Sequence, residues 1–331
     1  MRPRRASPAG RLGGRNMAAL LTGGTSVLPK PPSRIHRGLT GARELVGSAY
    51  LADAGIRREY EGEIAPRTVA ALQSIFVRTP WLAPRRVLDL GAGTGATSEV
   101  VRARWPNAEM VAVDKVAGPG ILRADVTRAL RPPSVQGRFD LIVAAHLLGE
   151  LALDLDGRAR LVQGWCCDLL EEHGTCVLIE PALRETSRGL LAVRDRLLVA
   201  GLFVVAPCLF CGPCPALVRD RDFCHTSTAA ITQGRSRVDF SYLVLRKQGT
   251  TCTDPSRFRI VSDPMKDKGR LRFYACGPAG RLLVTRLDRE RSPSNQLLDQ
   301  IERGDVVEIL SATIQSDGLR CGRDSAITRA G

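Results

Sequence analysis

The chain has 331 residues, of which 44% are hydrophobic and 25% are charged, and its formal net charge is +14. This length can bury a sizeable core, which excludes a fibrous or wholly disordered protein. No apolar run approaches the ~20 residues that a membrane-spanning helix needs, so we expect a soluble protein with no membrane partner.

The positive charge is concentrated in two flanks of the chain. Residues 1–43 contain eight Arg and one Lys with no acidic residue, and residues 246–291 have a net charge of +7, whereas residues 44–245 are neutral. Arg and Lys neutralise phosphates, so two basic flanks on a neutral core indicate a nucleic-acid partner. The alternative is a general bias toward arginine, since 43 of the 48 basic residues are Arg.

Residues 1–43 are expected to form a basic, flexible tail. The tail lacks the long apolar stretch of a secretory signal, and it is rich in Arg and free of acids, as mitochondrial transit peptides are. The same arginine bias runs through the whole chain, so this feature does not by itself indicate mitochondrial import. Met17 is an alternative start.

The central part of the chain alternates between strand and helix patterns. Residues 44–80 show helical spacing, and Pro66 stands where the first turn of a helix tolerates proline. Residues 81–249 predict a Rossmann-like α/β domain whose sheet is covered by helices on both faces. The expected strands are 85–91, 109–114, 138–145, 175–181, 202–207 and 239–247, and the expected helices are 96–105, 159–173 and 188–200.

Residues 250–331 show a different sequence pattern, in which short apolar segments are separated by Pro, Gly and Asp. This pattern predicts a small, basic, β-rich module. In the segment RLRFYAC, period-two alternation places Arg270 and Arg272 on one face and Leu271 and Phe273 on the other. The basic face either binds RNA or is an ordinary solvated surface.

A glycine-rich loop, VLDLGAGTGATS, follows the first expected strand of the α/β domain. Glycines allow a tight turn and let backbone N–H groups approach a ligand at the start of a helix. The G-x-G-x-G spacing, with an acid two residues before it, differs from the dinucleotide fingerprint and favours S-adenosylmethionine over NAD. An acid that closes the second strand suits the ribose hydroxyls, and one eleven residues later suits the adenine amine. The predicted cofactor site is Asp89, Gly91, Gly93, Gly95, Asp114 and Asp125.

Candidate catalytic residues follow the strand expected at 138–145. The segment HLLGEL after strand 138–145 lacks the Asn-Pro-Pro-aromatic clamp of amino-methylating enzymes. His146 and Glu150 are four residues apart on the helix expected there, where they could act as acid and base. The alternative role for both is packing and capping at the edge of the cofactor site.

A cysteine-rich loop spans residues 206–227 and joins the last two expected strands. Cys208, Cys211 and Cys214 have the spacing C-x2-C-x2-C, and Cys224 follows. Clustered cysteines in a chain without a secretory signal indicate metal or redox chemistry. A close triplet beside proline with a remote fourth thiol favours a [4Fe–4S] cluster, with zinc as the alternative. Because this loop follows a strand at its carboxyl end, we expect it beside the cofactor.

These motifs together resemble a known family. EIAPRTVAAL, VLDLGAGTG, HLLGEL, VLIEP, VVAPCLFCGPCP, DFCHTS and FSYLVLRK are similar, in order, to the methyltransferase-like family of mitochondrial small-ribosomal-subunit proteins and their bacterial relatives. The resemblance implies a class I methyltransferase fold, a [4Fe–4S] cluster and association with the small subunit during its assembly. Methyl transfer is in doubt for some members.

The resemblance also implies a set of cluster ligands. They would be Cys208, Cys214, Cys224 and Cys276, with Cys211 at a variable position as a possible substitute. Cys276 belongs to the C-terminal module, so the cluster would fix that module to the α/β core. We therefore expect a monomeric, rRNA-associated assembly factor. The compact length resembles the bacterial members of the family, so we expect the protein in the bacterial cytoplasm, with the mitochondrial matrix as the alternative. The alternatives are a non-catalytic rRNA clamp and a zinc-bearing small-molecule methyltransferase.

Overall fold

The computed structural model describes residues 33–128, 131, 135–232, 235–249 and 254–330. Most of the expected tail, including Met17, lies outside these residues. Within the described ranges, no helix is long and apolar enough to cross a membrane.

The N-terminal segment contains the helices α1 (Arg34–Thr40), α2 (Ala54–Glu63) and α3 (Ala65–Arg78). Helix α1 falls inside the stretch expected to be a tail, because the side chain of Ile35 is buried against α2. The helical spacing expected from residue 44 produces no α-helix before Ala54, and Tyr50–Ala52 form only a short 3-10 helix. Gly47 has a φ of +80° there, which interrupts the helix, and α2 begins only where Asp53 accepts the N–H groups of Gly55 and Ile56.

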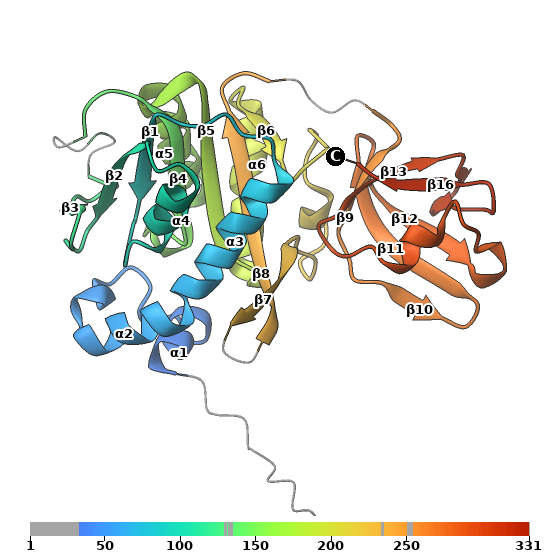
Figure 1. Ribbon diagram of the computed structural model, residues 1–331, viewed down its shortest axis with the longest axis horizontal. Coiled ribbons are helices and arrows are strands. Elements are labelled where there is room, and N and C mark those ends of the chain that lie inside the picture. The colour runs from blue at the N-terminus through green and yellow to red at the C-terminus, as the bar shows by residue number, and fades with distance from the viewer. Residues whose placement is uncertain (1–32, 129–130, 132–134, 233–234, 250–253, 331) are drawn as a thin grey trace, which may run out of the picture. The chain divides into compact units, whose positions relative to one another are not determined.

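The central sheet has the strand order β3-β2-β1-β4-β5-β8-β6, with β7 paired to β8 (Figure 1). Strands β1 to β5 run parallel to one another, whereas β8 runs antiparallel to both β5 and β6. The bounds are β1 Arg86–Leu90, β2 Glu109–Asp114, β3 Ile121–Arg123, β4 Phe139–Ala145, β5 Leu170–Pro181, β6 Phe203–Ala206, β7 Thr226–Thr232 and β8 Arg235–Arg246.

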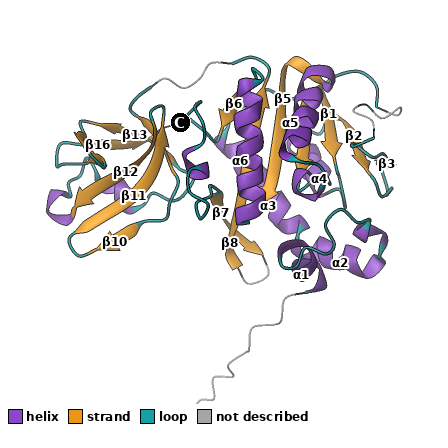
Figure 2. Cartoon of the chain, turned by 180° about the vertical axis from the view of Figure 1, so that it is seen from behind, coloured by secondary structure: helices purple, strands orange, loops and turns teal. Residues whose placement is uncertain are grey.

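Helices cover both faces of this sheet because alternate strand residues point to opposite sides. On β1, Val87 packs with α3 and α4 (Ala96–Arg104), while Leu88 packs with α5 (Leu155–Gly164) and α6 (Arg184–Val199). Figure 2 shows α5 and α6 on the face opposite α3. This strand order, with β8 reversed, is the class I methyltransferase fold that the sequence predicted.

Two local expectations in this domain differ from the structure. The helix expected over 159–173 ends at Gly164, followed by a π-helical turn at Trp165–Leu169. Strand β5 then begins at Leu170, five residues earlier than expected, because Leu170 is buried and pairs with Phe139 of β4. Strand β7 was not expected, since its small and polar residues have no apolar run.

The C-terminal part forms a second sheet with the order β14-β15-β12-β11-β9-β13-β16, and β10 pairs with β11. Along β11 the odd-numbered residues Leu271, Phe273 and Ala275 are buried in the core of this sheet. The alternation expected for Arg270 and Arg272 is confirmed. The bounds are β9 Arg257–Ile260, β10 Met265–Asp267, β11 Arg270–Gly277, β12 Gly280–Leu287, β13 Val306–Leu310, β14 Thr313–Gln315, β15 Gly318–Arg320 and β16 Ala326–Arg329.

Candidate functional site

The glycine loop lies between the end of β1 and the start of α4. Gly91, Gly93 and Gly95 have φ values of +70°, +58° and +88°, a region in which side chains other than glycine are strained. The N–H groups of Gly91 and Ala92 donate to the carbonyl of Val113 at the end of β2. A Cβ on Gly91 would lie 3.0 Å from Cδ1 of Leu147, so the loop is also tightly packed.

The two acids after the second and third strands lie at the same cavity as the loop. Asp114 accepts the N–H of Gly93 at 3.0 Å and that of Val116 at 2.8 Å. Asp125 accepts from the hydroxyl and the N–H of Thr127, and these bonds lower its pKa. Both acids line a cavity of about 80 Å³ with Gly91 and Gly93. Each carboxylate keeps lone pairs for a ligand, because a carboxylate can accept about four hydrogen bonds.

Asp89 has a different environment from these acids. It is buried within β1, and its Oδ2 accepts the hydroxyl of Ser98 in α4 at 2.8 Å. Burial raises its pKa to about 7. Among the described residues, Asp89 and Gly95 do not line the cavity. Asp89 therefore anchors α4 behind the loop.

The space at the glycine loop is small because N-terminal residues cover it. Tyr50 and Leu51 line the cavity together with Leu147, and the Tyr50 hydroxyl donates to Glu150 at 3.0 Å. Typical ligand pockets measure roughly 300–1,000 Å³, well above the value here. The donors and acceptors fit a nucleoside such as that of S-adenosylmethionine, but residues 48–51 must move for the whole molecule to enter.

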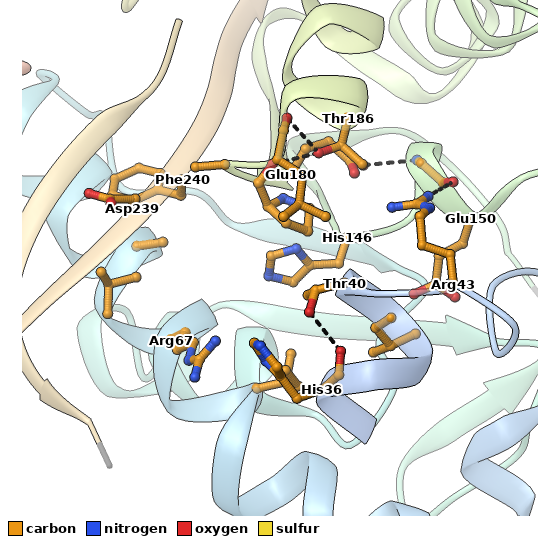
Figure 3. Close-up of a pocket in the computed structure, with 18 of the residues that line it drawn as sticks. His36, Thr40, Arg43, Arg67, His146, Glu150, Glu180, Thr186, Asp239 and Phe240 are labelled. Carbon is orange, nitrogen blue, oxygen red and sulfur yellow. Dashed lines mark hydrogen bonds between the residues drawn. The ribbon is translucent and has the colours of Figure 1, made fainter. Parts of the chain in front are cut away.

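A larger cavity of about 450 Å³ adjoins the first one, and Tyr60, His146 and Glu150 line both. Figure 3 shows His146 near its middle, with Glu180 and Thr186 on one side and Arg67 on the other. Its walls come from α1, α3, the end of β5, the start of α6 and β8. The larger cavity therefore lies at the carboxyl end of β5, beside the cavity of the glycine loop.

The prediction that His146 and Glu150 share one helix is wrong. His146 has a φ of +57°, and its N–H donates to the carbonyl of Ile179, so it continues the sheet contact of β4. Glu150 lies in a short 3-10 turn, Leu148–Glu150. Both side chains still line the larger cavity. Burial lowers the pKa of His146 to about 4 and raises that of Glu150 to about 7.

Glu180 is a functional candidate that the sequence reasoning missed. It is the last residue but one of β5, the residue is 2% exposed, and its carboxylate accepts the N–H of Gly149 at 3.2 Å. Burial raises its pKa to about 7. An acid at the end of the apolar run VLIEP was the available signal, because ligands bind at the carboxyl ends of strands in such sheets.

Four cysteines line a further cavity of about 70 Å³. Cys208, Cys214 and Cys224 come from the loop after β6, and Cys276 comes from β11 of the second sheet. The β11 alternation sends Cys276 away from its own core and toward this loop. Burial raises the pKa of Cys214 and of Cys276 to about 12.

Cys211 differs from these four cysteines because its side chain is exposed, and within the described ranges it is not part of the cavity wall. The described residues contain no group of three or more His, Cys, Asp or Glu side chains arranged to hold a metal ion. The four thiols thus share one cavity without meeting at a single point. Their number and chemistry fit a thiolate-bound cluster, which binds each thiolate at its own iron atom.

The cysteine loop and the glycine loop lie at the same edge of the sheet but not side by side. Strands β4, β5 and β8 separate β1 from β6, which corresponds to about 19 Å at the usual strand spacing. The expectation that the cysteine loop lies beside the cofactor is therefore wrong. The reversed strand β8 follows the loop in the chain but lies between β5 and β6.

Polar contacts join the cysteine loop and the C-terminal sheet. Arg281 of β12 pairs with Asp222 at 2.9 Å, and Arg259 of β9 donates to Cys224 Sγ at 3.2 Å. Away from the loop, Arg78 of α3 lies 3.6 Å from Asp305.

The fold and the glycine-loop cavity define a class I methyltransferase-like protein. The model of the family described as mitochondrial small ribosomal subunit Rsm22 matches residues 60–292. Because this match covers more than half of the chain, the chain belongs to that family.

Other comparisons are weaker. A trans-aconitate 2-methyltransferase from Rhodopseudomonas palustris (strain BisB5) is 34% identical over 74 residues, which are 22% of this chain and 26% of that protein. The chain thus spans about a quarter of the length of this curated relative.

Solved methyltransferase structures are also similar to the chain. The plantazolicin methyltransferase BpumL in complex with SAH is 10% identical, with 65% of this chain and 94% of that chain covered and a TM-score of 0.35. CalO1, a methyltransferase in calicheamicin biosynthesis, is 19% identical, with 60% and 59% covered and a TM-score of 0.36. These scores are too low to add to the argument from strand order.

Proposed function

We propose that this chain binds S-adenosylmethionine at the glycine loop, holds a [4Fe–4S] cluster at the thiol cavity and associates with rRNA of the small ribosomal subunit during its assembly. The observation that carries the proposal is the shared cavity of Cys208, Cys214, Cys224 and Cys276. These thiols come from two parts of the chain that differ in fold. We place the protein in the bacterial cytoplasm, with the mitochondrial matrix as the alternative.

The cofactor proposal is supported by the acids around the glycine loop. Asp114 would accept the ribose hydroxyls, and Asp125 would accept the adenine amine. The N–H groups of the loop stand at the start of α4, where a helix carries partial positive charge. When bound, S-adenosylmethionine supplies an electrophilic methyl group.

The larger cavity supports a methyl-acceptor site for the enzyme version of this function. Glu150 and Glu180 have pKa values of about 7, so near neutral pH either can take a proton from an N–H or O–H acceptor. His146 stays neutral, and its Nε2 is hydrogen bonded to Thr68 Oγ1 at 3.1 Å. Its Nδ1 has no partner among the described residues and is available to orient an acceptor.

A non-catalytic clamp is the second candidate, and one observation favours it. The Tyr50 hydroxyl and Leu51 occupy space at the glycine loop, and Tyr50 is held there by Glu150. A chain that keeps this contact on the ribosome would bind rRNA without using the cofactor. Transfer of a radiolabelled methyl group to immature small subunits, compared with Asp114→Ala, separates the two candidates. Labelled rRNA with the wild type alone supports the enzyme, and no label above the variant supports the clamp.

The metal proposal is tested by anaerobic purification, an absorption spectrum and quantification of iron and zinc. We expect iron and sulfide with a broad absorption band in the visible range. Zinc without iron would replace the cluster by a structural zinc site and favour the small-molecule methyltransferase. If the chain contains neither metal but still co-sediments with small subunits, the cluster proposal is refuted and the proposed ribosome association still stands.

A further inference from the structure

Two buried arginines stand at the thiol cavity. Arg194 of α6 is 1% exposed and Arg259 of β9 is 2% exposed, and both line the cavity with the four cysteines. They come from the two parts of the chain that the cavity joins. Lys and Arg are almost never fully buried unless they are paired, so each position needs a compensating negative charge.

Arg259 finds no carboxylate among the described residues. Its Nη1 donates to Cys224 Sγ at 3.2 Å, and its Nη2 donates to the hydroxyl of Thr226 at 2.6 Å and to the carbonyl of His225 at 3.2 Å. These partners are a sulfur atom, a carbonyl and a hydroxyl, and none of them is a carboxylate. The buried guanidinium of Arg259 therefore has no carboxylate partner within the part of the chain that the structure describes.

Arg194 is only partly compensated. Its Nη1 pairs with Asp195 at 2.5 Å and donates to the carbonyl of Gly212 at 2.8 Å, while its Nη2 donates to the carbonyl of Phe210. Asp195 is shared, because its other oxygen accepts the N–H of Cys214 at 2.9 Å. The charge of Arg194 is thus held within the loop that carries the thiols.

Both guanidinium groups also have an unused donor. Neither Nε of Arg194 nor Nε of Arg259 has a hydrogen-bond partner among the described residues, although both atoms are buried. A buried donor without an acceptor is costly. Sulfur atoms bearing negative charge in this cavity would supply both the acceptors and the missing charge.

We propose that Arg194 and Arg259 are the counter-charges of the thiolate-bound centre. The inference rests on the proposed cluster. Four thiolates carry more negative charge than the oxidised [4Fe–4S] core carries positive charge, so the loaded site is an anion. Two fixed guanidinium groups stabilise that anion, and they also favour its reduction, because the added electron increases the negative charge.

The experiment compares Arg259→Gln and Arg259→Lys with the wild type after anaerobic reconstitution with iron and sulfide. The readouts are iron per chain and the reduction potential from a dithionite titration. Arg259→Gln should hold several-fold less iron, and any cluster it holds should have a more negative potential. Arg259→Lys keeps the positive charge but lacks the planar guanidinium group, so the reduction potential of its cluster should stay near that of the wild type. Wild-type iron content and potential in Arg259→Gln would overturn the inference.

The matched control is Arg286→Gln. Arg286 is also a buried arginine of the C-terminal sheet, but it pairs with Asp299 away from the thiols. This variant should lose stability without a change in potential; if its potential shifts as that of Arg259→Gln does, the effect is general and the inference fails. Should Arg259→Gln be insoluble, Arg194→Gln carries the same test from the other side of the cavity.

Different results would contradict the proposed cluster and the proposed role of the two arginines. A wild-type chain without iron contradicts the cluster before any variant is compared. If the wild type holds zinc instead, the proposed role of the arginines is supported only if the zinc content falls in Arg259→Gln and not in Arg286→Gln.

Discussion

Arg259 and Cys224 are hydrogen bonded at 3.2 Å although 35 residues separate them in the chain. Arg259 belongs to β9 of the C-terminal sheet, and Cys224 lies in the cysteine loop of the α/β domain, two residues before β7. The contact joins two parts of the chain whose cores are distinct. Loss of the thiol site should therefore affect how firmly the two parts associate.

Cys276→Ser should remove most of the bound iron and make the C-terminal sheet easier to cleave by protease. The reason is that Cys276 is the thiol that the second sheet contributes. Iron quantification and limited proteolysis with mass spectrometry measure both effects. Cys211→Ser is the control and should behave as the wild type, since its side chain is exposed. If the two variants lose iron equally, the ligand set is wrong.

Asp114→Ala should weaken binding of S-adenosylmethionine by 10-fold or more, which corresponds to about 1.4 kcal/mol for each factor of ten. The change removes an acceptor for the ribose and also frees the N–H groups of Gly93 and Val116. Isothermal titration measures the affinity. Asp154→Ala is the control, because Asp154 caps α5 outside the cavity. An unchanged affinity in Asp114→Ala would contradict the proposed cofactor site.

Gly91→Ala should lower both stability and cofactor affinity. Its φ of +70° costs a residue with a side chain about 1–2 kcal/mol, and the new Cβ would lie 3.0 Å from Leu147. Gly120→Ala isolates the first effect, since Gly120 has a φ of +68° with open space around the added Cβ. Chemical denaturation should show the larger loss for Gly91→Ala, and only that variant should bind the cofactor less tightly.

Glu180→Gln should make the chain more stable at pH 8 than the wild type. Burial raises the pKa of Glu180 from 4.5 to about 7, so the folded state favours the protonated acid. Its favourable contribution is complete below the unfolded pKa and is lost as the pH rises through about 7. The upper limit is about 3 kcal/mol at 1.36 kcal/mol per pKa unit. Denaturation at pH 5 and pH 8 measures it, and equal pH dependence in both proteins would contradict the assignment.

Asp267→Asn should strengthen binding of small-subunit rRNA at low salt. Arg270 and Arg272 share an exposed face of β11, but Asp267 is ion-paired with both. Removing this acid leaves two cations for phosphates, which should steepen the salt dependence of binding. A filter-binding salt titration measures the slope. Asp317→Asn, on the turn after β14, is the control for the change in net charge.

The sequence by itself determined the α/β domain, because strand and helix periods and the glycine spacing depend on near neighbours in the chain. Helices α4 and α6, the loop from Gly91 to Gly95 and the position of the cysteine loop were predictable in this way. The family resemblance is likewise a property of linear motifs, and the family match over residues 60–292 bears it out. The ligand roles of Cys208, Cys214, Cys224 and Cys276 stay predictions.

Only the tertiary structure decided which distant side chains meet. Arg259 lines the thiol cavity with the four cysteines, and Glu180 lines the larger cavity with His146. The reversed strand β8 lies in the sheet between the strands that precede the glycine loop and the cysteine loop. No periodic pattern or residue spacing in the sequence predicts these contacts, because each depends on how sheets and loops from separate segments pack. The left-handed backbone of His146 is a further case, since the sheet contact with Ile179 overrides the helical spacing of its own sequence.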